Sequence, residues 1–374
     1  MLNPPVQPCL RNTARSTLPS LSDDLLTWTG MKPEAIILCL AVSLMTACAG
    51  VRSVSETQSV HGKAAPKPLY RDPVYDGAAD PTVMWNPQTS SWFMFYTNRR
   101  ANMPDPEGVE WVHGTPISIA ESTDGGVTWR YKRNAVINYP HSGDNSITYW
   151  APDVFFHEET WHMYLTIVPG VFTDWAHPRT IAHFTSTDML SWHYESTLKL
   201  ANEKVIDADV IALPDGGWRM FYNNEPDGKS VYYADSDDLY HWQDKGKAQL
   251  ASRGEGPVAF KWQGYWWLIV DAWRGLAVYR SNDLTRWEQQ TGYLLADPGT
   301  GKDDGINGGH PDVVVENDRA WLFYFTHGGR VGENAGKENA ESRRSVIQVT
   351  ELQFEGNWLT TDRNAPALIS LPAK

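Results

Sequence analysis

The sequence predicts an all-β fold, a single-domain five-bladed β-propeller over residues 71–370. From residue 71 onward, short apolar and aromatic runs recur between Gly, Asp, Asn and Pro residues, with almost no helical signal. Three pieces recur together: an opening strand with Asp or Glu beside Pro or Ala, an aromatic strand, and a Ser-x-Asp turn leading to a Trp. The turn tryptophans at 129, 192, 242 and 287 are 63, 50 and 45 residues apart. Repeats of about 40–60 residues with several strands each indicate a propeller.

Five units follow one another along the chain, and five units predict five blades. Their opening and aromatic strands lie at residues 80–97, 150–167, 207–224, 255–271 and 310–326. Their turns lie at residues 121–129, 185–192, 235–242 and 280–287, and a last strand is expected near residues 345–352. A β-sandwich is the alternative, but it would not place an acidic residue at the first strand of unit after unit.

The turn at residues 122–129 reads STDGGVTW and matches the SxDxGxTW turn of many propellers. We expect its Ser and Asp to bond to the backbone of the turn and its Trp to fill the space between strands. This turn is a folding device and carries no chemistry.

Composition excludes several classes of function. The chain of 374 residues has a net charge of −13, so it repels phosphate backbones and nucleic acid is not expected as a partner. The mean hydropathy of −0.44 excludes a polytopic membrane protein. The 18 tryptophans exceed ordinary usage. Most are expected in the core, and the remainder offer faces on which sugar rings can stack.

The N-terminal segment predicts export. Residues 35–47 (AIILCLAVSLMTA) form an apolar run of signal-peptide length after Met31 and Lys32. Small residues and then Cys48 resemble a bacterial lipoprotein box, so residues 31–48 are read as a lipoprotein-type signal and Cys48 as the lipidated residue. Residues 1–30 then lie upstream of the true start, and residues 49–70 form a linker. The protein is expected in the outer membrane through this lipid anchor, or periplasmic or secreted. Plain signal cleavage and an uncleaved anchor helix remain alternatives.

Acidic residues at the starts of the opening strands predict the active centre. In a propeller these strands line the central axis, so Asp80, Asp153, Asp207, Glu255 and His310 should converge at one mouth of the channel. Converging carboxylates repel one another, and proteins keep them for binding a cation or for acid–base chemistry.

The opening strands resemble glycoside hydrolase family 43, the five-bladed arabinanase and xylosidase group. Residues 79–83 (ADPTV), 149–154 (YWAPDV), 205–210 (VIDADV), 254–257 (GEGP) and 309–314 (GHPDVV) are similar to five motifs of that family, in the same order. The resemblance implies a hydrolase of plant or algal poly- or oligosaccharides that inverts the anomeric configuration. It implies Asp80 as general base, Glu255 as general acid, and Asp207 as the residue that tunes this acid.

Two departures from the family pattern leave alternatives open. Ala208 replaces the usual proline, so Asp207 and Asp209 compete for the tuning role, and strand alternation places both on one face. Asp72, in a second Asp-Pro pair, is a weaker rival to Asp80.

Further residues are expected to bind the sugar or surround it. The candidates for substrate binding are Trp150, Asp153, Asp209, Trp273, Arg274 and His310. No cofactor is required and no metal ligand is certain, although His310 could lie near an axial structural calcium, which prefers oxygen ligands. The insertions at residues 99–120, 169–180 and 297–309 could wall off one end of a groove, and the acidic stretch at residues 297–312 could build a sugar subsite.

Two rival functions remain at this stage. A non-catalytic, surface glycan-binding lipoprotein would keep the aromatic residues but would not need acids at three blade starts. An anhydrogalactosidase of the agar-degrading propeller group is the second enzyme alternative. No nucleotide-binding, serine-esterase or zinc-protease motif is found.

Overall fold

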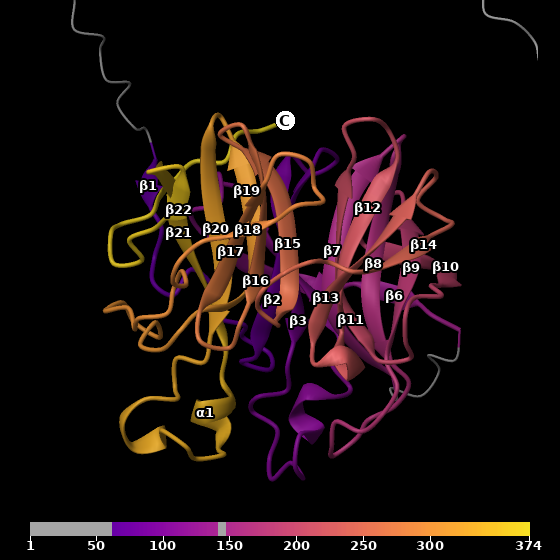
Figure 1. Ribbon diagram of the computed structural model, residues 1–374. Helices are drawn as coiled ribbons and strands as arrows, with labels where there is room; N and C mark the ends of the chain where they lie inside the picture. Colours follow the sequence, from indigo (N-terminus) through magenta and orange to yellow (C-terminus); the bar gives the residue numbers. More distant parts are fainter. Residues whose placement is uncertain (1–61, 141–146) are drawn as a thin grey trace, which may run out of the picture. The chain divides into compact units, whose positions relative to one another are not determined.

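The computed structural model describes residues 62–140 and 147–374, and it confirms the predicted all-β propeller. Five separate sheets follow one another along the chain. Figure 1 shows their opening strands β2, β7, β11, β15 and β19 toward the middle of the view, with β22 and β10 at opposite edges. Residues 1–30, the signal segment 31–48 with Cys48, and most of the linker lie outside the described residues.

Each blade is a meander whose strands keep their chain order. Blade 1 contains β2 (Ala78–Asn86), β3 (Ser91–Asn98), β4 (Ile117–Ser122) and β5 (Arg130–Asn134). Blade 2 contains β7 (Thr148–His157), β8 (Thr160–Val168), β9 (Thr180–Ser186) and β10 (Ser191–Thr197), and β6 (Val136–Asn138) adds to it in parallel with β10. Blade 3 contains β11 (Val205–Ala212), β12 (Trp218–Asn224), β13 (Ser230–Ser236) and β14 (Gln243–Lys247). Blade 4 contains β15 (Glu255–Trp262), β16 (Tyr265–Asp271), β17 (Leu276–Ser281) and β18 (Glu288–Gln289). Blade 5 contains β19 (Gly309–Glu316), β20 (Arg319–Thr326), β21 (Val346–Glu355) and β22 (Trp358–Thr360).

Helical structure in the described residues is confined to short segments in loops. These are the 3₁₀ turns η1 (Glu110–Val112), η2 (Glu225–Asp227) and η3 (Gly332–Asn334) and the single-turn helix α1 (Ala340–Arg343). Figure 1 shows α1 in the long loop that joins β20 to β21. No helix among these residues has the length and apolar character needed to cross a membrane.

The core lies between neighbouring blades, where aromatic strands bury their side chains. Trp92, Trp192, Trp267 and Trp321 are among the largest fully buried side chains. Replacing such a side chain with Ala costs about 3–5 kcal/mol, so these contacts hold adjacent blades together without disulfides.

The Ser-x-Asp turns bond to their own backbone, as the sequence predicts. In the first of them, Asp124 Oδ1 accepts a hydrogen bond from Thr128 N at 2.9 Å, and the indole of Trp129 donates to Gly126 O at 3.0 Å. In the second, Asp188 Oδ1 accepts from the amides of Leu190 and Ser191 at 2.7 and 2.8 Å. These hydrogen bonds are local to each turn and need no partner from another blade.

Closure of the ring joins the two ends of the described chain. Val83 N in blade 1 donates to Asp312 Oδ2 in blade 5 at 2.8 Å. The short strands β1 (Lys63–Ala64) and β23 (Leu368–Ile369) pair with each other, and Tyr70 N donates to Ile347 O at 3.1 Å. The end of the predicted linker, residues 62–70, thus belongs to the folded unit, because its backbone groups pair with the last blade.

Candidate active site

A cavity of about 620 Å³ is lined by residues from all five blades. Of the residues that the sequence singles out, six line it: Asp80, Trp150, Asp207, Glu255, Trp273 and His310. They come from opening strands or, for Trp273, from the loop after β16. Blade closure therefore brings together side chains that are up to 230 positions apart in the sequence (80 to 310).

A β-bulge occurs at the same place in every opening strand. The pairing register shifts at positions 79–82, 150–153, 206–209, 255–258 and 309–312. One residue in each bulge has a positive φ angle: Asp80 (51°), Ala151 (45°), Asp207 (59°), Gly256 (54°) and His310 (33°). Bulges re-aim side chains, and non-glycine residues keep such strained angles where the surrounding structure enforces them.

Asp80 lies in a buried, positively charged environment. Arg99 Nη2 donates to Asp80 Oδ1 at 2.9 Å and to Oδ2 at 3.3 Å, and Nδ1 of His310 lies 3.4 Å from Oδ1. Burial by itself would raise the pKa of Asp80, but the charges of Arg99 and His310 outweigh burial and lower the pKa below its ordinary value. Asp80 is therefore ionised at neutral pH.

The surroundings of Asp207 raise its pKa, in contrast to those of Asp80. Its side chain is buried, and its Oδ2 accepts a hydrogen bond from Gly256 N at 3.0 Å, next to Glu255. Burial, together with the negative charges of Glu255 and Asp80, raises the pKa of Asp207 to about 7 although His310 acts against this. Two carboxyl groups of one cavity thus have pKa values displaced in opposite directions, which is the pattern of acid–base sites.

His310 and Gly256 fit against each other at the axis. A Cβ atom on residue 256 would lie 2.8 Å from the His310 ring, so only glycine fits at this position of the GEGP motif. Burial lowers the pKa of His310, but Asp80, Asp207 and other carboxyl groups around it outweigh burial and raise the pKa. The surrounding carboxylates therefore favour the protonated form of the imidazole.

A cationic network holds Glu255 from the side of blade 3. Lys229 Nζ lies 2.8 Å from Glu255 Oε2 and 3.1 Å from Glu225 Oε1, and Arg179 Nε lies 2.5 Å from Glu225 Oε2. Burial would lower the pKa of Lys229, but Glu255 and Glu225 outweigh it and raise that pKa. Glu255 is half-buried, with 25% of its side chain exposed, so it remains accessible from the cavity.

Asp153 and Asp209 do not line the cavity, contrary to the expected convergence. They occupy the position two residues after the bulge, where Asp153 Oδ2 accepts from Val210 N and Asp209 Oδ2 accepts from Ala259 N, both at 2.9 Å. Each carboxyl group joins its blade to the next one. Because the bulge interrupts strand alternation, Asp207 and Asp209 have different surroundings, and only Asp207 lines the cavity.

Two other candidates also lie outside the cavity lining. The guanidinium of Arg274 lies 4.6 Å from the centre of the Tyr293 ring, and Arg274 also donates to the hydroxyl of Tyr293. Asp72 accepts hydrogen bonds from Val74 N and from the hydroxyl of Tyr96, so it shapes a turn before blade 1.

The structure adds residues that the sequence reasoning missed. Arg99 follows β3, Asp271 ends β16 and Lys229 precedes β13, and all three line the cavity. Asp271 accepts hydrogen bonds from Trp273 N at 2.7 Å and His310 N at 2.9 Å. Burial and the charge of Glu255 raise its pKa to about 6. For Arg99 and Asp271, a polar residue at the end of an aromatic strand is the local signal that could have indicated them, whereas Lys229 lies in the turn before β13 and has no such signal.

Two of the predicted insertions form an aromatic wall. Trp111 from residues 99–120 and Trp175 from residues 169–180 line the cavity together with Trp150 and Trp273. The rings of Trp150 and Trp175 lie 6.1 Å apart, and His113 packs against both. Trp175 and Trp273 have exposed fractions of 53% and 39%, and Lys229 and Arg253 lie over the Trp273 ring at 5.4 and 5.5 Å from its centre.

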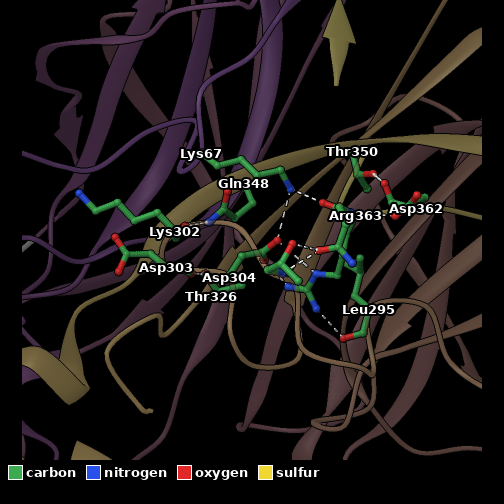
Figure 2. Close-up of polar contacts among 12 residues, drawn as sticks. Lys67, Leu295, Lys302, Asp303, Asp304, Thr326, Gln348, Thr350, Asp362 and Arg363 are labelled. Atoms are coloured by element: carbon green, nitrogen blue, oxygen red, sulfur yellow. Dashed lines mark hydrogen bonds and ion pairs between the residues drawn. The ribbon is translucent and has the colours of Figure 1, made fainter. Parts of the chain in front are cut away.

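The acidic insertion at residues 297–309 contributes Ile306 and Asn307 to the cavity, whereas its central acids face elsewhere. Asp304 is fully buried and bonds to Arg363 and to Lys67 Nζ, the latter at 3.3 Å (Figure 2). Asp303 pairs with Arg344 at 2.5 Å. These ion pairs fasten the insertion to the folded body, so its charges build no sugar subsite.

A structural calcium near His310, held through water, stays a prediction. Among the described residues, no group of three or more His, Cys, Asp or Glu side chains is arranged to hold a metal ion. The carboxyl groups around His310 already accept from Arg99, from Gly256 N and from two further amides.

Comparison with known proteins identifies the family. The sequence model described as Glycosyl hydrolases family 43 matches residues 70–359. A search of curated proteins finds no match. Among solved structures, a thermostable family-43 glycoside hydrolase is 17% identical, with a TM-score of 0.58, covering 81% of this chain and 98% of that one.

Two further solved structures have similar folds. A xylan β-1,4-xylosidase from Bacillus halodurans is 17% identical, with a TM-score of 0.57, covering 79% of this chain and 57% of that one. A family-43 enzyme from Xanthomonas citri, solved with xylotriose, is 12% identical, with a TM-score of 0.56 and coverages of 83% and 97%. The family match extends over most of the chain and over all five blades, so this chain belongs to glycosyl hydrolases family 43 and is a glycoside hydrolase.

Proposed function

We propose that the protein hydrolyses O-glycosidic bonds of a plant or algal poly- or oligosaccharide and inverts the anomeric configuration. In this proposal Asp80 is the general base, Glu255 the general acid, and Asp207 the residue that tunes the acid. The observation that carries the proposal is that these three carboxyl groups, from blades 1, 3 and 4, line one cavity.

Asp80 has the properties of a base that activates water. Its pKa is lowered by Arg99 and His310 despite burial, so the carboxylate is charged over the neutral range. One oxygen can accept a proton from water while Arg99 holds the group in place. Protonation of Asp80 during the reaction produces an acid that readily passes its proton on to solvent.

Glu255 would protonate the leaving oxygen, with Asp207 beside it. The hydrogen bond from Gly256 N to Asp207 Oδ2 fixes the backbone next to Glu255. Lys229 Nζ holds the carboxyl group of Glu255 at 2.8 Å. We therefore expect substrate to separate Glu255 from Lys229 before the proton is transferred.

Inversion requires a water molecule between the base and the sugar. The two carboxyl groups of inverting enzymes stand about 6.5–9.5 Å apart, whereas retaining enzymes hold them about 5–5.5 Å apart. Proton NMR of the first anomer released from a reducing-end product distinguishes the two courses. Release of the anomer with retained configuration would contradict the assignment of Asp80 as a base.

The aromatic wall favours exo action on a chain end. Trp111 and Trp175 come from insertions in blades 1 and 2 and line the cavity. A closed wall admits the end of a chain more readily than its middle. Similar solved structures include a xylosidase and a complex with xylotriose, so xylo-oligosaccharides should be tested among the first substrates.

We further propose export and lipid anchoring through Cys48, from the apolar run at residues 35–47. Labelling of growing cells with radioactive palmitate, comparing the full chain with Cys48→Ala, tests this. A labelled wild type and an unlabelled variant are expected. Equal labelling of both proteins would contradict lipidation at Cys48.

The principal experiment measures release of reducing sugar by protein that lacks residues 1–48. The panel contains xylo-oligosaccharides, arabinan, arabinoxylan, galactan, agaro- and carrageeno-oligosaccharides and pectic side chains. Glu255→Gln should reduce kcat by about 10²–10⁴-fold, the usual contribution of a general acid. Glu203→Gln, at an exposed position away from the cavity, is the matched control and should retain activity.

Each outcome of that experiment has a defined meaning. Unchanged activity in Glu255→Gln would refute its assignment as the acid. Binding of a glycan without any cleavage would favour the non-catalytic alternative. Cleavage confined to agaro- or carrageeno-oligosaccharides would favour an anhydrogalactosidase-type activity.

A further inference from the structure

Four permanently charged cations line the cavity, and three of them are paired with acids. The paired cations are Arg99 with Asp80 at 2.9 Å, Arg179 with Glu225 at 2.5 Å, and Lys229 with Glu225 and Glu255 at 3.1 and 2.8 Å. The fourth cation is Arg330. No carboxylate of the described residues lies within ion-pair distance of its guanidinium.

The backbone holds Arg330 so that its outer nitrogen atoms stay free. Arg330 Nε donates to Ser342 O at 2.9 Å, and neither Nη1 nor Nη2 has a protein partner within the described residues. The side chain is exposed and lines the cavity. A guanidinium whose Nε is occupied still presents two parallel donors, the geometry that binds carboxylate or sulfate oxygens in pairs.

The loop that carries Arg330 is fastened at its far end. It joins β20 to β21 and contains α1 (Figure 1). Arg343 Nε and Nη2 donate to Ala101 O and Met103 O at 3.0 and 2.9 Å, and Arg344 pairs with Asp303. A cation on an anchored loop loses little conformational entropy when it binds a ligand.

Among the charged groups that act on Arg330, Arg99 is positive, and Glu338 is negative but lies beyond ion-pair distance. His327 Nδ1 faces the carbonyl of Arg344 at 3.1 Å, and His327 Nε2 faces Arg99 Nη1 at 3.4 Å. A carbonyl only accepts and a guanidinium only donates, so Nδ1 carries the proton and His327 is neutral. Burial, followed by the charges of Arg330 and Arg99, lowers the pKa of His327 well below its ordinary value.

We propose that the sugar bound in this cavity carries an oxyanionic substituent, a carboxylate or a sulfate ester, which pairs with Arg330. The proposal rests on the hydrolytic function proposed above and specifies the class of its substrate. The anion would bind beside blade 5, where Arg330 follows β20 and lines the cavity.

The test compares matched ligands that differ only in the anion. Acidic xylo- and pectic oligosaccharides are paired with their carboxyl-reduced forms, and carrageeno-oligosaccharides with their desulfated forms. Binding is measured by calorimetry with Glu255→Gln, which isolates affinity from turnover, and kcat/KM is measured with the wild type. The variants are Arg330→Gln, Arg330→Lys and, as a control at an exposed position on β5, Arg130→Gln.

We expect one anionic form to bind at least about tenfold more tightly than its neutral partner, as charge-assisted hydrogen bonds allow. Arg330→Gln should remove this ratio, Arg330→Lys should keep part of it, and Arg130→Gln should keep all of it. The ligand pair that shows the ratio distinguishes carboxylate from sulfate. Melting temperatures identify a variant that fails to fold, in which case Arg330→Lys carries the comparison.

Equal affinity for charged and neutral partners, or a ratio that survives in Arg330→Gln, would overturn the inference. Cleavage of neutral glycosides at the same kcat/KM as charged ones would also overturn it while leaving the hydrolase proposal intact. Binding of anionic forms without cleavage would support Arg330 and contradict the hydrolase proposal.

Discussion

Replacing Arg99 with Gln should move the acidic limb of the pH–activity profile upward. Arg99 Nη2 contacts both oxygens of Asp80, at 2.9 and 3.3 Å, and Asp80 has an exposed fraction of only 4%. A hydrogen bond to a charged group contributes about 1.5–3 kcal/mol, and about 1.4 kcal/mol corresponds to one pH unit. The pKa of Asp80 in Arg99→Gln should therefore rise by about one to two pH units.

The sign of the effect follows from the ionised form of the base. Asp80 works as a carboxylate, and Arg99 lowers its pKa, so in the wild type activity is lost only at acidic pH. Without the guanidinium, Asp80 takes up its proton at a higher pH, and activity is lost earlier as the pH falls. The free energy of unfolding should also decrease as the pH falls, because the stability contributed by ionised Asp80 is lost as the pH falls through its folded-state pKa.

The assay is kcat/KM against pH on the best substrate, for wild type, Arg99→Gln and the exposed control Arg130→Gln. Unfolding by urea at each pH separates loss of catalysis from loss of the fold. An acidic limb that stays in place in folded Arg99→Gln would refute the reasoning. Either Asp80 would not be the ionising base, or the ion pair would not tune it.

Two further predictions concern stability. His162 Nδ1 and His183 Nε2 lie 2.9 Å apart in the core, and burial lowers the pKa values of these histidines to about 4 and about 3. Below the ordinary histidine pKa, the unfolded chain binds protons at these positions and the folded chain does not. The free energy of unfolding should therefore fall from about pH 6.5 toward pH 4, by about 1.4 kcal/mol per pH unit for each histidine. Urea titrations at several pH values should show a smaller slope of this free energy against pH for His183→Phe, and an equal slope would contradict this account. Asp304→Asn should reduce the free energy of unfolding by about 3–5 kcal/mol because Arg363 and Lys67 lose their buried counter-charge (Figure 2). Thermal unfolding beside the exposed control Asp215→Asn measures the change, and a loss no larger than in the control would show that the ion pairs stabilise little.

Local pattern determined the repeat and the turns of this protein. Aromatic strands bounded by turn residues, and Ser-x-Asp turns that bond to their own backbone, depend on neighbours in the chain, so the sequence predicted five blades and the mouth at which their opening strands meet. It also predicted that Asp80, Asp207 and Glu255 would meet, because equivalent strand starts of a closed ring share one axis.

Tertiary structure alone decided which acids face the cavity and which cations face them. A bulge of one residue separates the surroundings of Asp207 from those of Asp209, and strand alternation cannot predict a bulge that blade packing imposes. Arg99 and Arg330 lie on loops without a repeated pattern; Arg99 pairs with Asp80 inside blade 1, and Arg330 has no ion-pair partner among the described residues. Contacts between blades, such as His310 with Asp80 and Lys229 with Glu255, form only when the ring closes, so the charge balance of the cavity is a property of the closed propeller and not of any single motif.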